Sequence, residues 1–244
     1  MADDPSLKKM RTAVFIQCVG SREPDRPYCS RVCCTHSIDN AIEMKKLKPE
    51  MDVFILYRDI RTYGEREYLY KEAREAGVIF IRYDLENKPV LTIRENSIDI
   101  RVTDHVLQRP VVISADLVTL ASAILPNKDE ALAQFFKVPL NDDGFFVEKH
   151  AKLGPSEFAT DGVFLCGLAH YPKPIDEAIA QGRASASRAI TLLAKETINT
   201  SGTVAETEPA ICSSCGVCVS ICPYSAPSFI EADARMHAGK ASIN

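Results

Sequence analysis

Eight of the nine cysteines of this 244-residue chain fall into two groups of four. The first group comprises Cys18, Cys29, Cys33 and Cys34, and the second comprises Cys212, Cys215, Cys218 and Cys222. The N-terminus carries no apolar leader, so we expect a reducing, cytoplasmic location, where thiols serve metal binding or redox chemistry rather than a disulfide framework. Two groups of four thiols are what two four-ligand metal sites require.

The second group has the spacing of an iron–sulfur ligand run. From Cys212 to Pro223 the pattern is Cys-x-x-Cys-x-x-Cys-x-x-x-Cys-Pro, which supplies four thiolates to a 4Fe-4S cluster, with Gly216 permitting the close turn. Zinc sites more often pair two cysteine knuckles across a longer spacer. In two-cluster ferredoxins the fourth cysteine binds the other cluster, and no second run follows here. We therefore expect either a one-cluster module or an incomplete one, after a polar linker at 196–209.

Strands and helices alternate in the first part of the chain. Short apolar runs predict strands, and amphipathic segments between them predict helices. The strands are Thr12–Gln17, Asp52–Tyr57 and Val78–Tyr83, and the helices are Thr35–Lys48 and Glu65–Ala76. This order favours an α/β fold with a parallel βαβ sheet. Further on, we expect a hairpin within Pro89–Thr103, strands at Val111–Ile113, Leu117–Leu120 and Gly162–Leu165, and a helix at Ile175–Ala194 with Pro174 at its first position.

The first cysteine group lies between the first strand and the first helix. Dinucleotide-binding folds carry their Gly-x-Gly-x-x-Gly loop at this position, and no such triplet occurs anywhere in the chain. A helix N-terminus favours a bound anion, so a loop of thiols here suits an anionic cluster. The irregular spacing alone also permits buried structural thiols, or a redox switch at the vicinal pair Cys33–Cys34.

Gln17–Arg22, continued by Tyr28–Cys34, resembles the signature of the A-subunit of heterodisulfide reductase and its relatives. The run Arg58–Gly64 is also similar to that family, although alone it is a charged turn. The resemblance implies a 4Fe-4S cluster on Cys18, Cys29, Cys33 and Cys34, close to a flavin.

Asp161–Gly167 resembles the segment by which thioredoxin-reductase-like flavoproteins close their FAD site. The resemblance implies FAD contacts from Gly167, Leu168, Ala169, His170, Pro174, Ile175 and Asp176. Without it, the segment is an ordinary buried strand and helix, and His170 is as compatible with a solvated loop as with a functional role. The lone Cys166 is expected to be a small buried residue.

The resemblance runs from about Arg11 to Cys222 and sets the expected organisation. Residues 1–105 would form a degenerate dinucleotide-binding-like domain with the cysteine group, 106–197 the C-terminal half of an FAD-binding domain, and 198–244 a ferredoxin-like module. The fold class is thus a partial thioredoxin-reductase-like unit with an appended iron–sulfur module. FAD would be shared with a chain that carries the missing N-terminal half.

The function expected from these features is electron transfer. The chain would be a subunit of a heterodisulfide-reductase-like complex, and the resemblance implies flavin-based bifurcation. A net charge of −4 argues against nucleic acid as a partner, and no apolar stretch approaches the roughly 18 residues of a membrane span. A zinc-stabilised interaction module and an NAD(P)H-dependent flavin reductase remain as alternatives.

Overall fold

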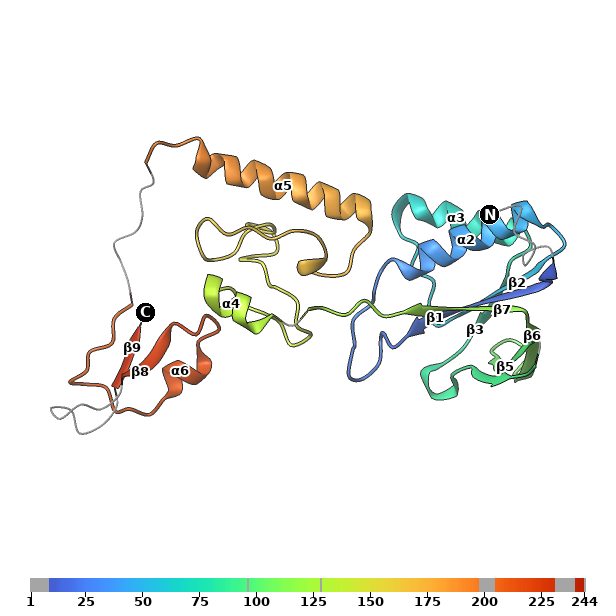
Figure 1. Ribbon diagram of the computed structural model, residues 1–244, viewed down its shortest axis with the longest axis horizontal. Helices are drawn as coiled ribbons and strands as arrows, with labels where there is room; N and C mark the ends of the chain where they lie inside the picture. The colour runs from blue at the N-terminus through green and yellow to red at the C-terminus, as the bar shows by residue number, and fades with distance from the viewer. Residues whose placement is uncertain (1–8, 96, 128, 198–204, 231–239, 244) are drawn as a thin grey trace. The chain divides into compact units, whose positions relative to one another are not determined.

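The computed structural model describes residues 9–95, 97–127, 129–197, 205–230 and 240–243 (Figure 1). The chain divides into two compact units, Met1–Leu125 and Pro126–Asn244. The division falls after the boundary expected at residue 105, because the strands that follow this position pair with earlier strands of the first unit. Each unit is described by itself.

The first unit is built on a four-stranded parallel sheet in the order β3-β2-β1-β7. Its strands are β1 (Thr12–Val19), β2 (Asp52–Tyr57), β3 (Ile79–Arg82) and β7 (Leu117–Ser122). The helix α2 (Cys33–Leu47) connects β1 to β2, and α3 (Glu67–Glu75) connects β2 to β3. The predicted parallel βαβ arrangement is confirmed, and β1 is a central strand with a partner on each side.

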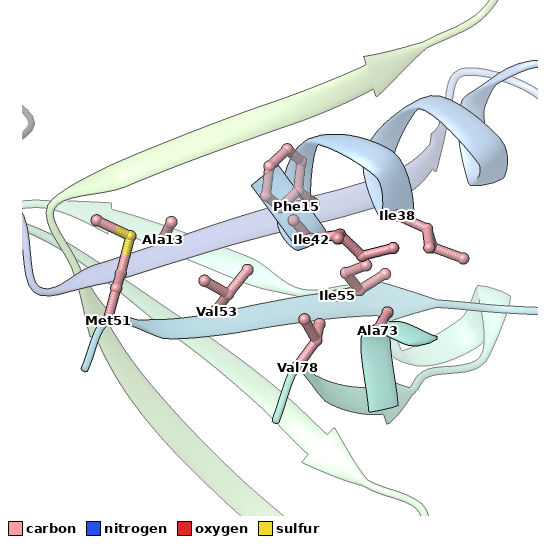
Figure 2. Packing of buried hydrophobic residues seen from close by; sticks show 10 residues of the cluster. Ala13, Phe15, Ile38, Ile42, Met51, Val53, Ile55, Ala73 and Val78 are labelled. Carbon is pink, nitrogen blue, oxygen red and sulfur yellow. The ribbon is translucent and has the colours of Figure 1, made fainter. Parts of the chain in front are cut away.

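The two faces of the sheet bury different residues of β1, because successive side chains of a strand point to opposite faces. Ala13 and Phe15 pack with Ile38 and Ile42 of α2, as Figure 2 shows for the cluster beneath the helices. Val14 and Ile16 belong to the core on the opposite face. This double burial explains why the strand is a continuous apolar run in the sequence.

The opposite core is closed by a three-stranded antiparallel sheet in the order β4-β5-β6. Its strands are β4 (Val90–Ile93), β5 (Ile98–Asp104) and β6 (Arg109–Ala115). The hairpin expected within Pro89–Thr103 is confirmed by β4 and β5, which pair with Val90 opposite Arg101. The first unit is therefore a parallel sheet between a layer of helices and a second small sheet (Figure 1).

Helices make up most of the regular structure in the described residues of the second unit. These are α4 (Glu130–Phe136), α5 (Ile175–Leu193) and the short α6 (Val217–Ile221), which precedes a hairpin of β8 (Pro227–Ile230) and β9 (Lys240–Ile243). A small core joins Ala133, Val138, Phe158 and Leu165. None of the described helices combines the length and apolar character that crossing a bilayer requires.

Two expectations in the second unit are wrong in detail. Gly162–Leu165 is not a strand: only an isolated bridge joins Glu157 to Phe164, because the chain turns back tightly and Phe158 N donates to Val163 O at 3.2 Å. Pro174 caps α5 and is not its first residue, since its ψ of 158° is extended.

Shortening a buried side chain of α2 should destabilise the first unit. Ile42→Ala leaves a cavity beneath the sheet, because Ile42 is 2% exposed, and we expect the free energy of unfolding to fall by about 2–5 kcal/mol. Leu47→Ala, on the same helix but 53% exposed, should cost much less. Urea unfolding followed by circular dichroism measures both. Equal losses for the two variants would contradict this account of the core.

Candidate functional site

The first cysteine group lies where β1 ends and α2 begins. Cys18 is near the carboxyl end of β1, Cys29 is in the following loop, and Cys33 and Cys34 open α2. The carboxyl ends of parallel strands are the usual site of ligand binding in α/β sheets. Cys18, Arg22 and Arg31 have φ values near +60°, a conformation that costs L-residues about 1–3 kcal/mol and occurs most often at functional sites.

Hydrogen bonds to distant segments hold this loop in place. Tyr28 Oη donates to Ile124 O at 2.9 Å, and Ile124 N donates to Ser30 Oγ at 3.0 Å, which ties the loop to the chain just after β7. Tyr83 Oη donates to Gln17 O at 2.6 Å, beside Cys18. The segments that follow β7 and β3 therefore hold the loop that carries the thiols.

The four thiols of the loop lie close enough to affect one another. Burial raises the pKa of Cys34 to about 11; a hydrogen bond from the Arg61 amide opposes this, and the thiols of Cys18, Cys29 and Cys33 add to it. Burial, followed by Cys29 and Cys18, raises the pKa of Cys33. Such thiols stay protonated at neutral pH unless a metal ion draws off the proton.

The backbone of the turn after β2 and the Arg22 side chain border the thiols. Arg22 Nη2 donates to Asp59 Oδ2 at 2.6 Å, and Cys34 Sγ lies 3.7 Å from Asp59 O. Burial lowers the pKa of Arg22, but the Asp59 hydrogen bond and the interaction with Cys18 outweigh it and raise the pKa. The turn at Arg58–Gly64 therefore lines the cysteine loop.

The chemistry of this loop fits an anionic metal cluster. It offers four thiols, an arginine beside Cys18, and buried polar atoms on Gln17, Arg22 and Thr62 that have no hydrogen-bond partner. Within the ranges described, no three cysteine, histidine or acidic side chains are assembled in a metal-binding arrangement. The fold thus brings Cys18, Cys29, Cys33 and Cys34 into one region, and their role as ligands stays a prediction.

The second cysteine group lies on a short segment around α6. Cys215 and Cys218 are exposed, and Cys212 and Cys222 are half-buried. As expected, the chain turns closely at Gly216, which has a φ of +75° and would bring an added Cβ within 3.3 Å of the Phe229 ring. The Val217 amide and then the Ser213 hydroxyl lower the pKa of Cys215, which favours the thiolate that a metal needs.

The predicted flavin-contacting residues form one continuous surface segment. Gly167, Leu168 and Ala169 make a single 3-10 turn, followed by His170, and the buried Pro174 leads into Ile175 and Asp176 at the start of α5. Leu168, Ala169, Ile175 and Asp176 are exposed. Cys166 is exposed as well, so the expectation that it is buried is wrong: it lies outside the small core that holds Leu165.

A hydrogen-bonded network supports this segment from beneath. The buried Lys173 donates from Nζ to Gly167 O and to Gln181 Oε1, both at 2.8 Å. Gln181 Nε2 lies 2.7 Å from His170 Nδ1, and His170 Nε2 lies 2.9 Å from Glu148 Oε2. A neutral His170 would accept at Nδ1 and donate to Glu148, so its ring is held and not solvated on all sides.

Lys173, Gln181 and Glu148 are not among the predicted site residues. The position of Lys173 between Pro172 and Pro174 is a signal, because two prolines restrict where its side chain can reach. Glu148 lies 22 residues before His170 and gives no local signal.

The curated proteins that are similar to this chain are named as heterodisulfide reductase A-subunits or as proteins like them. This chain is 36% identical over 237 residues to the iron-sulfur A-subunit 2 of CoB–CoM heterodisulfide reductase from Methanopyrus kandleri. The match covers 94% of this chain and 36% of that protein. The chain is 35% identical over 235 residues to the heterodisulfide reductase A-subunit-like protein of Archaeoglobus profundus, covering 95% of this chain and 33% of that protein. This chain belongs to the heterodisulfide reductase A-subunit-like family. It spans about a third of the length of these relatives.

The other comparisons bear on the fold. The thioredoxin reductase of T. acidophilum matches with a TM-score of 0.51 and 14% identity, over 75% of this chain and 53% of that one. This likeness confirms the thioredoxin-reductase-like α/β fold of this member of the heterodisulfide reductase family. No family model matches the sequence.

Tyr83 should make the stability of the first unit depend on alkaline pH. Burial, and then Cys18, raise the pKa of Tyr83 to about 12, whereas an unfolded tyrosine ionises near about 10. Protonated Tyr83 therefore contributes fully to the free energy of unfolding below a pH of about 10. This contribution is lost as the pH rises through about 12, and the loss amounts to at most about 3 kcal/mol.

The measurement compares wild type with Tyr83→Phe by urea unfolding across this pH range. Below about pH 10 the variant should be less stable by about 1 kcal/mol, since it lacks the bond to Gln17 O. As the pH rises, the difference should shrink to zero and then reverse, because only the wild type loses the larger contribution from the raised pKa of Tyr83. Tyr68→Phe, at a 76% exposed position, is the control. A difference that is constant with pH would contradict the assignment.

Proposed function

We propose that this chain is an electron-transfer subunit of a heterodisulfide-reductase-like oxidoreductase, which relays electrons between a flavin and 4Fe-4S clusters. The convergence of Cys18, Cys29, Cys33 and Cys34 at the carboxyl end of the parallel sheet carries the proposal. The names of the relatives, which describe an iron-sulfur component and reductases of a heterodisulfide and ferredoxin, support it. The chain spans about a third of the length of those relatives, so their activity is a proposal for this chain.

The cysteine loop would hold one cluster, which supplies one-electron chemistry when bound. The residues of this chain would act around it. Arg22 would offset the negative charge of the cluster, and the amides of Arg31 and Arg61 already point at the sulfurs of Cys29 and Cys34, with Arg31 N 3.3 Å from Cys29 Sγ. Hydrogen bonds of this kind tune the potential of iron–sulfur sites.

The second cysteine group would hold another cluster near the protein surface. Cys215 and Cys218 are exposed, so a cluster here would be open to an external electron donor or acceptor. The ligand spacing and the short hairpin β8–β9 after it support a ferredoxin-like module.

The segment Gly167–Asp176 would contact one edge of FAD. Lys173 and Gln181 hold the Gly167 backbone, and the start of α5 presents main-chain amides of the kind that bind a flavin carbonyl or phosphate. The ADP part of FAD needs a glycine-rich loop that the sequence lacks. We therefore propose that a partner subunit, or another part of the same protein, supplies the other half of the FAD site.

Exposed apolar residues on one face of α5 also indicate that a further protein segment packs there. Ile175, Ile179, Ile190 and Leu193 follow one another along the helix at spacings close to whole turns, and all are more than half exposed. An added Cβ on Gly182, in the same stripe, would meet nothing within 4 Å. An apolar stripe of this length is normally covered by protein.

Replacing one ligand of the loop should remove one cluster only. Cys29→Ala leaves three thiols, so we expect anaerobically purified protein to lose about four iron and four sulfide per chain and one of two low-temperature EPR signals. The second signal should persist, because its ligands lie in the other unit.

Cys166→Ala, at an exposed cysteine outside both groups, is the matched control and should keep the full iron content. Retention of both signals in Cys29→Ala would refute the ligand assignment. Zinc without sulfide in the wild-type protein would instead establish a zinc-stabilised interaction module.

The chain by itself should bind FAD weakly. It lacks the phosphate-binding loop that secures the ADP part, so we expect less than stoichiometric flavin after gel filtration. Flavin absorbance and quenching of flavin fluorescence measure the binding. Tight, stoichiometric binding of FAD together with NAD(P)H would favour a self-sufficient flavin reductase.

A further inference from the structure

Several buried polar side-chain atoms near the cysteines have no hydrogen-bond partner. Among the described residues, the buried side-chain nitrogen and oxygen atoms without a partner belong to Gln17, Arg22, Thr62 and Ser214. Ser214 lies directly before Cys215, and the other three surround the cysteine loop of the first unit. Their distribution therefore follows the two cysteine groups and not the general core.

Such atoms are costly. A buried donor or acceptor left unpaired destabilises a protein by about 1–3 kcal/mol, and native proteins contain few of them. Gln17 is 0% exposed with both amide atoms unpaired, and Thr62 is 3% exposed. Leucine and valine of similar size would avoid this cost at the two positions. The donors among these atoms, Gln17 Nε2, Arg22 Nη1 and Thr62 Oγ1, therefore point to a partner that accepts hydrogen bonds.

Strand geometry directs Gln17 toward the cysteines of α2. Alternation along β1 places Gln17 on the same face as Ala13 and Phe15, which pack beneath α2. Because Gln17 is nearer the carboxyl end of the strand, it lies toward the start of the helix, where Cys33 and Cys34 are found. The bond from Tyr83 Oη to Gln17 O fixes its backbone.

Arg22 lies beside one of these thiols, and Thr62 belongs to a turn whose backbone contacts another. Arg22 interacts with the sulfur of Cys18 and uses Nη2 for Asp59, which leaves Nη1 buried and unpaired. Thr62 directly follows Arg61, whose amide donates to the sulfur of Cys34. Buried donors from β1, from the loop and from the turn after β2 thus belong to the segments that position the four cysteines.

We propose that Gln17 Nε2, Arg22 Nη1 and Thr62 Oγ1 donate hydrogen bonds to the sulfur atoms of a cluster held by Cys18, Cys29, Cys33 and Cys34, and that these bonds raise its reduction potential. The inference rests on the proposed function. Reduction adds one negative charge to a cluster, so each donor stabilises the reduced form more than the oxidised form. These residues are positioning residues that act on the cluster through its sulfurs.

The test uses the full chain, loaded with its clusters and purified without oxygen. Gln17→Leu and Thr62→Val each remove a donor at nearly constant size, and Thr62→Ser restores the hydroxyl. Thr92→Val, at an exposed strand position, is the matched control. Redox titration followed by EPR gives the potential of each cluster, with the C-terminal cluster as an internal reference.

We expect the reduced-to-oxidised ratio of the loop cluster, at a fixed solution potential, to fall about tenfold in Gln17→Leu and in Thr62→Val, which is a shift of about 59 mV for one electron. Thr62→Ser and Thr92→Val should leave it near the wild-type value. The C-terminal cluster should not shift in any variant. Unchanged loop potentials in both donor variants, with iron and sulfide intact, would overturn the inference, since ordered water would then satisfy these groups.

A measurement on the unaltered sequence covers variants that fail to fold. With glutamine labelled by 15N in its side chain, pulsed EPR of the reduced loop cluster should show a nitrogen coupling, because Gln17 is the labelled residue beside the thiols. No coupling would overturn the assignment of Gln17. Absence of the loop cluster itself would overturn the proposed function along with this inference, whereas a cluster with unmoved potentials would overturn this inference alone.

Discussion

Burial of β1 on both faces and both edges is the constraint on which the first unit depends. β1 pairs in parallel with β2 and β7, while α2 covers one face and the β4-β5-β6 sheet closes the other. A strand confined in this way must release the chain at the carboxyl end of the sheet, and the crossover helix must begin there too. Cys18 lies before that exit and Cys33 and Cys34 lie at the helix start, so the sheet brings these cysteines into one region.

The same burial sets the electrostatics of the loop. Desolvation keeps the thiols of Cys33 and Cys34 protonated, and a metal cluster requires thiolates, so the loop depends on compensating donors and positive charge to bind one. Arg22 and the Arg61 amide supply part of this compensation. Gln17 Nε2 and Thr62 Oγ1, which lack partners, would then be available to donate to a charged acceptor, at a cost in stability to the metal-free protein.

Features that depend on local periodicity could be predicted from the sequence. The parallel strands, α2 and the β4–β5 hairpin follow from apolar runs and turn residues, and all are confirmed. The strand predicted at Gly162–Leu165 is wrong because periodicity cannot distinguish a strand from a tight turn of four residues. The boundary after Leu125 and the Glu148–His170 contact depend on pairing between distant segments, which no local pattern encodes.

The two cysteine groups differ in how much scaffold they need, and this difference has a functional consequence. The C-terminal group lies within a segment of 11 residues with a regular spacing, so its pattern can be recognised in the sequence, and Cys215 and Cys218 are exposed. The loop group draws on a strand end, a loop and a helix start, so its spacing is irregular and its surroundings are buried. Solvent exposure and hydrogen bonds to sulfur are main determinants of cluster potential. Two clusters bound in such unlike surroundings would therefore differ in reduction potential.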